Sequence, residues 1–156
     1  MKTTRELAKE ESHDRLVQNL QQLLVKNYDA DKGIRKALKE VKSQKLKDYF
    51  KKEALRHHRY ATELDRIIHS LNATPLEEGS AVGRFHRIWM DIMLVVSGND
   101  DKTILSETKR GQKATIQEYE EKLKTGKFPP KIAEVLKRQL EELKTNLSPE
   151  IPSEAA

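Results

Sequence analysis

Residues 79–101 read GSAVGRFHRIWMDIMLVVSGNDD and contain the only tryptophan of the 156-residue chain, Trp89. Apolar side chains recur at helical spacing from Val82 to Val96, so this stretch predicts a short apolar helix, which Gly98 ends. The segments on both sides of it are longer and more highly charged. We therefore place the short helix on a connection that crosses between pairs of longer helices.

The rest of the chain is also predicted to be helical, because its apolar residues recur at steps of three and four and no stretch alternates with period two. Ser12 is expected to cap the first helix, and Asp100 or Asp101 the third long one. Short breaks join the helices into two hairpins, and residues 72–100 link the hairpins. The four long helices are expected over about residues 12–41, 46–71, 101–124 and 132–143.

FHRIWMD at residues 85–91, followed by SGNDDKTILSE at residues 97–107, carries a family resemblance. The order of HR, the WMD triplet, the G-x-D-D turn and the IL-x-E helix start resembles the uncharacterised bacterial ferritin-like proteins, a four-helix-bundle family of unknown function. The similarity extends over roughly residues 16–147. It implies a ferritin-like, stress-associated bacterial protein and no particular activity. Its signature residues here are His86, Arg87, Trp89, Met90 and Asp91.

Helix pattern and resemblance together predict an all-α protein: a ferritin-like up-down four-helix bundle with a short extra helix on the long crossover connection. Residues 12–147 should form this bundle. Residues 1–11 are expected to be a flexible N-terminus. The tail at residues 148–156 contains Pro149 and Pro152 and is expected to be disordered.

The composition removes several kinds of chemistry. The chain has no cysteine, so thiolate metal sites and thiol nucleophiles are excluded. It has no glycine-rich phosphate loop, no nucleophile elbow and no zinc-protease spacing, so no enzymatic activity can be assigned. No run approaches the ~18 apolar residues of a membrane span, and we expect a cytoplasmic protein.

A ferritin-like fold raises the question of a di-iron site, which needs a Glu-x-x-His pair on each of two helices. Here Glu53 is followed at the third position by Arg56. Neither the second nor the last of the four long helices contains a Glu-x-x-His pair. A weaker set could hold iron or another divalent metal, although no cofactor is expected. We favour a hydrogen-bonded polar layer instead, since unpaired buried charges are costly. The candidate ligands are Asp31, Glu53, His57, Glu107 and Gln139.

Trp89 is expected to dock the crossover helix, because its ring buries a large area and its N–H needs one fixed partner. A binding role for this aromatic stripe is the alternative. Gly33 and Gly111 each interrupt a strong helix at a cost of ~1 kcal/mol relative to Ala. Our hypothesis is that the first and third long helices cross near these two glycines, whereas the alternative is that both face solvent.

Positive charge is concentrated between Lys32 and Arg59. This stretch contains eleven Lys or Arg and three acidic residues, which gives a net charge of +8. Such a patch can meet nucleic-acid phosphates, an anionic membrane or an acidic partner, or it can be a solvated face, which we favour. Nucleic acid is the less favoured partner, because no exposed aromatic platform is visible. We expect a structural bundle that acts through a homodimer, a higher homo-oligomer or a protein partner. The patch comprises Lys36, Lys39, Lys42, Lys45, Lys47, Lys51 and Lys52.

Overall fold

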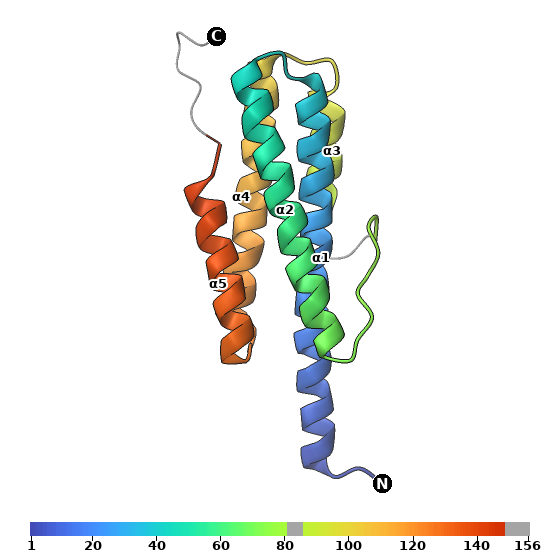
Figure 1. Cartoon of the computed structure of the whole chain (residues 1–156). Helices are drawn as coiled ribbons and strands as arrows, with labels where there is room; N and C mark the ends of the chain where they lie inside the picture. Colours follow the sequence, from blue (N-terminus) through green and yellow to red (C-terminus); the bar gives the residue numbers. More distant parts are fainter. Residues whose placement is uncertain (81–85, 149–156) are drawn as a thin grey trace.

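The computed structural model describes residues 1–80 and 86–148, apart from the side chain of His86. All the regular secondary structure of these residues is helical, so the prediction of an all-α protein is confirmed (Figure 1). Val82 and Phe85, predicted to belong to the short apolar helix, lie outside the described residues. The helices are α1 (Thr4–Glu40), α2 (Gln44–Ser70), α3 (His86–Val96), α4 (Asp101–Thr125) and α5 (Pro130–Thr145).

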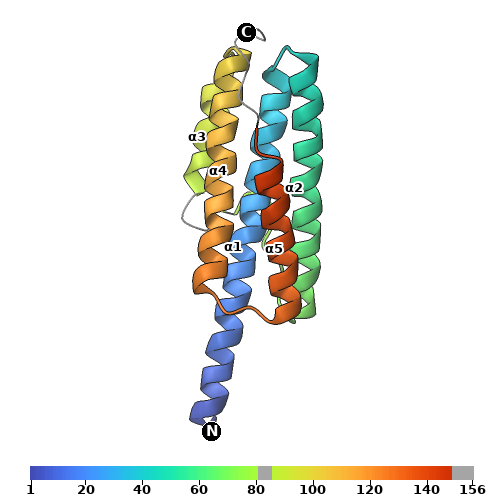
Figure 2. The ribbon, with the colours of Figure 1, turned by 90° about the vertical axis from the view of Figure 1, so that its left-hand side faces the viewer.

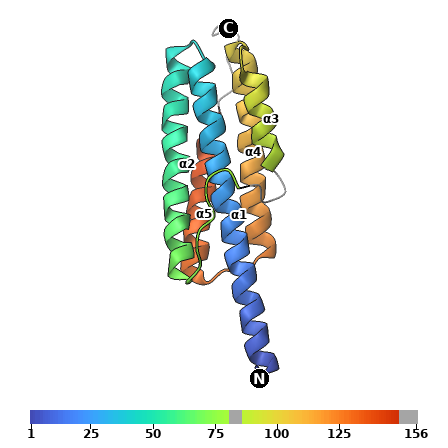
Figure 3. The same ribbon diagram turned by 90° about the vertical axis from the view of Figure 1, so that its right-hand side faces the viewer.

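The long helices run side by side, and the connections set their order. A turn at residues 41–43 folds α1 and α2 into the first hairpin, and residues 126–129 fold α4 and α5 into the second. α4 packs against α1, and α3 lies on the outside of that pair, in contact with both (Figures 1 and 3). α5 packs closely on α4 but stays further from α2, although it lies between the two in Figure 2.

α1 begins earlier than predicted. Thr3 caps it and forms a capping box with Glu6, and the helix starts at Thr4 rather than at Ser12. The prediction placed the start just before the apolar stripe, which begins at Leu16. The actual start is set by the capping box, which lies well before that stripe. Residues 4–11, part of the segment predicted to be flexible, are therefore helical. Figure 3 shows this end of α1 projecting beyond the other helices, and residues 1–15 are all exposed.

Two apolar clusters form the core, one in each half of the bundle. The half nearer the free end of α1 contains Leu20 and Leu24 from α1 and Leu64 from α2. The other half contains Ile34 from α1 and Phe50 from α2, together with the buried face of α3. Buried polar side chains from four helices lie between the clusters along the chain. They include Asn27, Glu53, His57, Gln112, Thr115 and Gln139.

Trp89 attaches α3 to the bundle. Its ring is fully buried, and its Nε1 donates a hydrogen bond of 3.1 Å to Oγ1 of Thr115. A Cβ atom on Gly33 would lie 2.3 Å from Cε3 of the ring, and one on Gly111 would lie 2.7 Å from Cζ2. The two glycines therefore make room for this ring, and the hypothesis that α1 and α4 cross near them stays a prediction.

The remaining signature residues of α3 lie further out. Met90 is half-buried, and Arg87 and Asp91 are exposed. The side chain of His86 lies outside the described residues. None of the described helices is both long and apolar enough to cross a membrane.

One carboxylate joins two turns at the same end of the bundle. Asp100 caps α4, as predicted, with a 2.8 Å bond from the backbone N–H of Thr103. Asp101 then accepts the backbone N–H groups of Lys42 and Ser43 at 2.8 and 2.9 Å. The start of α4 is thereby fixed to the turn between α1 and α2.

Candidate functional site

The buried polar layer is built around Asn27, whose hydrogen bonds reach α2 and α4 directly and α5 through Tyr119. Its Nδ2 donates to the Leu23 carbonyl at 2.9 Å and to the Tyr119 hydroxyl at 2.8 Å, and that hydroxyl donates to Gln139 at 2.7 Å. Its Oδ1 lies 2.8 Å from Nδ1 of His57. Because Nδ2 is the donor to both oxygens, Oδ1 must accept from His57, and the proton of this imidazole is assigned to Nδ1.

His57 is fully buried, and its Nε2 has no hydrogen-bond partner among the described residues. The pKa of His57 is lowered to about 3, chiefly by burial and to a lesser extent by the nearby Arg56 guanidinium. The imidazole is therefore neutral at physiological pH and contributes a hydrogen bond rather than a charge.

Glu53 lies one helical turn from His57 and is also buried. Its Oε1 accepts from Arg56 at 3.0 Å, and its Oε2 accepts from Gln112 at 3.2 Å. Burial raises the pKa of the Glu53 carboxyl, and Arg56 opposes that rise. Both oxygens therefore already have partners inside the protein.

The structure separates the five residues predicted as metal ligands. Glu53, His57 and Gln139 are buried in the polar layer with the partners just described. Asp31 instead pairs with Arg35 at 3.2 Å, and Glu107 with Arg110 at 2.8 Å. No three His, Asp or Glu side chains of the described residues lie close enough together to hold a metal ion. A metal site that combines all five residues stays a prediction.

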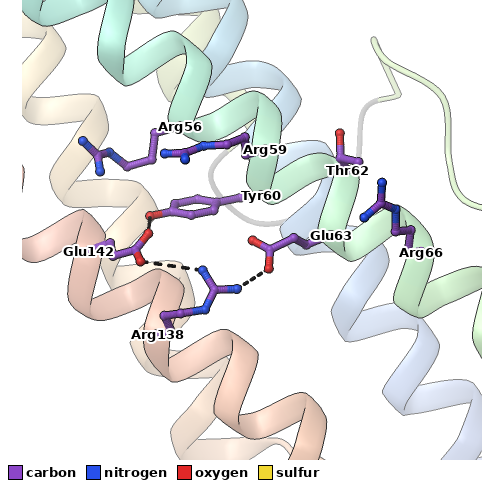
Figure 4. Close-up of a pocket in the computed structure, with 8 residues that line it drawn as sticks. All are labelled: Arg56, Arg59, Tyr60, Thr62, Glu63, Arg66, Arg138 and Glu142. Atoms are coloured by element: carbon purple, nitrogen blue, oxygen red, sulfur yellow. Dashed lines mark hydrogen bonds and ion pairs between the residues drawn. The ribbon is translucent and has the colours of Figure 1, made fainter.

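A groove of about 670 Å³ opens where α2 and α5 are held apart, beside the polar layer. In Figure 4, Tyr60 and Glu63 of α2 extend toward Glu142 and Arg138 of α5. They comprise Arg56, Arg59, Tyr60, Thr62, Glu63 and Arg66 from α2, and Arg138 and Glu142 from α5.

Arg138 joins the two walls of the groove. It pairs with Glu63 of α2 and lies 3.7 Å from Glu142 of its own helix (Figure 4). The Tyr60 hydroxyl donates to Glu142 at 2.6 Å, and Gln139 donates to Glu63 at 3.2 Å. The two carboxylates of the groove are therefore held by neighbours and connected to the polar layer.

Two arginines of the groove remain available. Arg59 and Arg66 are exposed, and neither makes an ion pair with another described residue. A guanidinium presents five N–H donors in a fixed plane and can hold a carboxylate or phosphate with two parallel hydrogen bonds. The groove thus offers two cationic groups beside carboxylates that are already paired.

Sequence reasoning did not find this groove. Arg56 was noted as the residue at the third position after Glu53 and Arg59 as the end of the basic stretch, whereas Arg66 and Arg138 were not singled out. A local signal exists, because Arg59, Glu63 and Arg66 follow one another at steps of four and three on one face of α2. The predicted lysine patch is a separate surface, most of it exposed, although Lys36 pairs with Glu40 at 3.0 Å.

Comparison with known proteins gives a family and no function. Residues 15–125 match a family described as a domain of unknown function (DUF2383). No curated protein and no solved structure matches the chain. The match runs from α1 to α4 and leaves out α5, which supplies Arg138 and Glu142 to the groove.

Proposed function

Because the chain belongs to the DUF2383 family, whose function is unknown, we propose from its own geometry that it is a non-enzymatic bundle that binds an acidic segment of a protein partner. The binding surface is the groove between α2 and α5. The observation that carries this proposal is the pair of exposed arginines, Arg59 and Arg66, in a groove whose carboxylates are already bound by other residues.

The spacing of the two arginines favours a segment with separate acidic groups. Arg59 and Arg66 are seven residues apart on α2, which corresponds to about 10.5 Å along the helix axis. Acidic side chains about two turns apart on a helix match that distance and lie on one face. One guanidinium can then hold each carboxylate.

The carboxylates of the groove argue for a protein partner over nucleic acid. Glu63 and Glu142 line the same groove as the two arginines. A continuous phosphate backbone would pass close to both and be repelled, whereas a protein segment can place neutral residues there. The groove also contains no exposed aromatic ring for base stacking, since Tyr60 is buried.

The interior supports a binding role over catalysis. Both oxygens of Glu53 are bound by neighbours, and His57 is fixed by Asn27. A general acid or base must lie within hydrogen-bonding reach of a substrate, and these groups are enclosed in the polar layer. The ferritin-like four-helix bundle, the cytoplasmic location, the bacterial origin and the association with stress belong to the same proposal. They rest on the resemblance of residues 85–107 and on the order of the helices.

A binding assay with matched variants tests the proposal. A fluorescent acidic peptide, with glutamates spaced to match the two arginines, is titrated with the protein and followed by anisotropy. The Arg59→Gln, Arg66→Gln double variant should bind about tenfold more weakly, because each lost carboxylate pair contributes up to about 1 kcal/mol at an exposed site. Binding should also weaken as salt is added.

The control removes the same charge elsewhere on α2. Lys45 and Lys51 are exposed and do not line the groove, so the Lys45→Gln, Lys51→Gln variant should bind the peptide as the parent does. Equal weakening in both double variants would mean that the peptide responds only to net charge. That result, or an absence of binding, would refute the groove as the binding surface. A single-stranded oligonucleotide that binds more tightly than the peptide would also refute the choice of partner.

A further inference from the structure

The N-terminal part of α1 lies outside the bundle. Residues 4–15 are helical and exposed, and Figures 1 and 2 show this end of α1 extending past the ends of the neighbouring helices. An isolated helix of this length is only marginally stable in water, although here it continues from a packed helix. This segment, residues 4–15, is called the α1 extension below.

Charge is divided between two faces of the α1 extension. At 100° per residue the acidic side chains fall within an arc of about 140°, which also contains the exposed Leu7. Arg5 and Lys9 lie on a separate side of the extension, whereas Arg15 lies about 40° from Glu11, at the edge of the acidic face. The acidic face consists of Glu6, Glu10, Glu11 and Asp14.

Part of the acidic face is already used within the chain. Glu6 belongs to the capping box and Glu10 pairs with Lys2. Glu11 and Asp14 make no ion pair with any other described residue, and both are exposed. Three residues apart, they lie on one side of the helix with Cβ atoms about 5–6 Å apart. The extension therefore presents two neighbouring acidic groups to solvent.

We infer that the acidic face of the α1 extension is the partner of the arginine groove, supplied by a second copy of this chain. The inference rests on the proposed function and names the acidic segment that the groove binds. Glu11 and Asp14 lack the cations that Arg59 and Arg66 provide, and these arginines lack carboxylates. Glu11 and Asp14 lie about 4.5 Å apart along the helix axis, less than the about 10.5 Å between the two arginines, so the long arginine side chains must converge on them.

Each contact joins two different surfaces, the extension of one copy and the groove of another. Two copies can exchange extensions to form a closed dimer, with two identical contacts. The contact area of each extension is small and its ion pairs are exposed, so the association is weakened by salt.

Charge reversal tests the contact. Sedimentation at low salt should show the parent as a species heavier than the 18.1 kDa monomer, which dissociates at high salt. The Glu11→Arg, Asp14→Arg variant and the Arg59→Glu, Arg66→Glu variant should each associate at least tenfold more weakly. An equimolar mixture of the two variants should associate again, because each extension then finds a groove of opposite charge. Circular dichroism verifies that both variants remain folded.

The controls separate this inference from the proposed function. Lys45→Glu, Lys51→Glu reverses two exposed charges outside the contact and should leave the association unchanged. A monomeric parent at low salt, or a mixture that stays monomeric, would refute the inference. If the acidic peptide still binds the groove of such a monomer, only the choice of partner fails. If the peptide does not bind either, the proposed function fails with it.

Discussion

Replacing Gly33 with alanine should destabilise the protein, against the usual effect of this substitution in a helix. In an ordinary helix interior, Gly→Ala stabilises by about 1 kcal/mol. Here the new Cβ would lie 2.3 Å from Cε3 and 2.9 Å from Cζ3 of Trp89. Carbon atoms pack at about 3.5–4.0 Å, so the ring would have to move by more than an ångström.

The Trp89 ring has little freedom to move. It is fully buried and is fixed by its hydrogen bond to Thr115. Overpacking a rigid core site costs about 1–3 kcal/mol, and we expect the upper end of this range. Subtracting the helix-propensity gain of about 1 kcal/mol leaves a net destabilisation of about 2 kcal/mol. Alanine at Gly111, where Cβ would lie 2.7 Å from both Trp89 and Ile92, should also destabilise.

A double-mutant cycle measured by urea unfolding tests this reasoning. Trp89→Ala alone should cost about 3–5 kcal/mol, because it leaves a large cavity. In the Trp89→Ala background, Gly33→Ala should instead stabilise by about 1 kcal/mol, since the ring that it meets is gone. A Gly33→Ala protein as stable as the parent, or the same effect in both backgrounds, would show that the glycine does not serve the ring.

Two further predictions concern pH and a turn. His57 has a folded-state pKa of about 3, below its ordinary value, so between pH 6.5 and 3 the unfolded chain binds a proton that the folded protein does not. Stability should therefore fall by about 2 kcal/mol from pH 7 to 5 in urea unfolding. The raised pKa of Glu53 acts in the opposite direction and offsets part of this fall. Because glutamine cannot titrate, the His57→Gln variant should lose less stability over the same pH range. An unchanged loss of stability would contradict the assignment of the fall to His57. Asp101→Ala leaves the Lys42 and Ser43 amides without their acceptor and should cost about 2 kcal/mol by the same measurement, whereas Asp101→Asn should cost less. An Asp101→Ala protein as stable as the parent would contradict the role of this carboxylate in joining the two turns.

The helices were predictable because the spacing of apolar residues within each segment shows which side of the helix is buried. Leu20, Leu24 and Leu64 recur at helical spacing, and all are buried in the structure. Asp100 likewise caps α4 as its sequence context predicts. The start of α1 was missed because the α1 extension buries nothing and so has no apolar stripe to read. Its signal is the capping box of Thr3 and Glu6, which depends on local hydrogen bonds rather than on burial.

The site was less predictable because it depends on distances between helices. Helical spacing places Arg59 and Arg66 on one face of α2, but nothing in that spacing shows that α5 stays far enough away to leave a groove. The rotation of each helix about its axis also determines which candidate ligands point into the interior. Glu53 points inward, whereas Glu107 forms a partly exposed ion pair with Arg110. Gly33 and Trp89 were each singled out, yet their contact joins segments from opposite sides of a long connection.

The most direct test of the account is to locate acidic-peptide binding by NMR. Backbone amide shifts are recorded while the unlabelled acidic peptide is added to the labelled protein. Changes should cluster at residues 56–66 of α2 and 138–142 of α5, and should disappear in the Arg59→Gln, Arg66→Gln variant. Changes confined to the lysine patch at residues 36–52 would contradict the central claim and would move the binding surface to the α1–α2 turn.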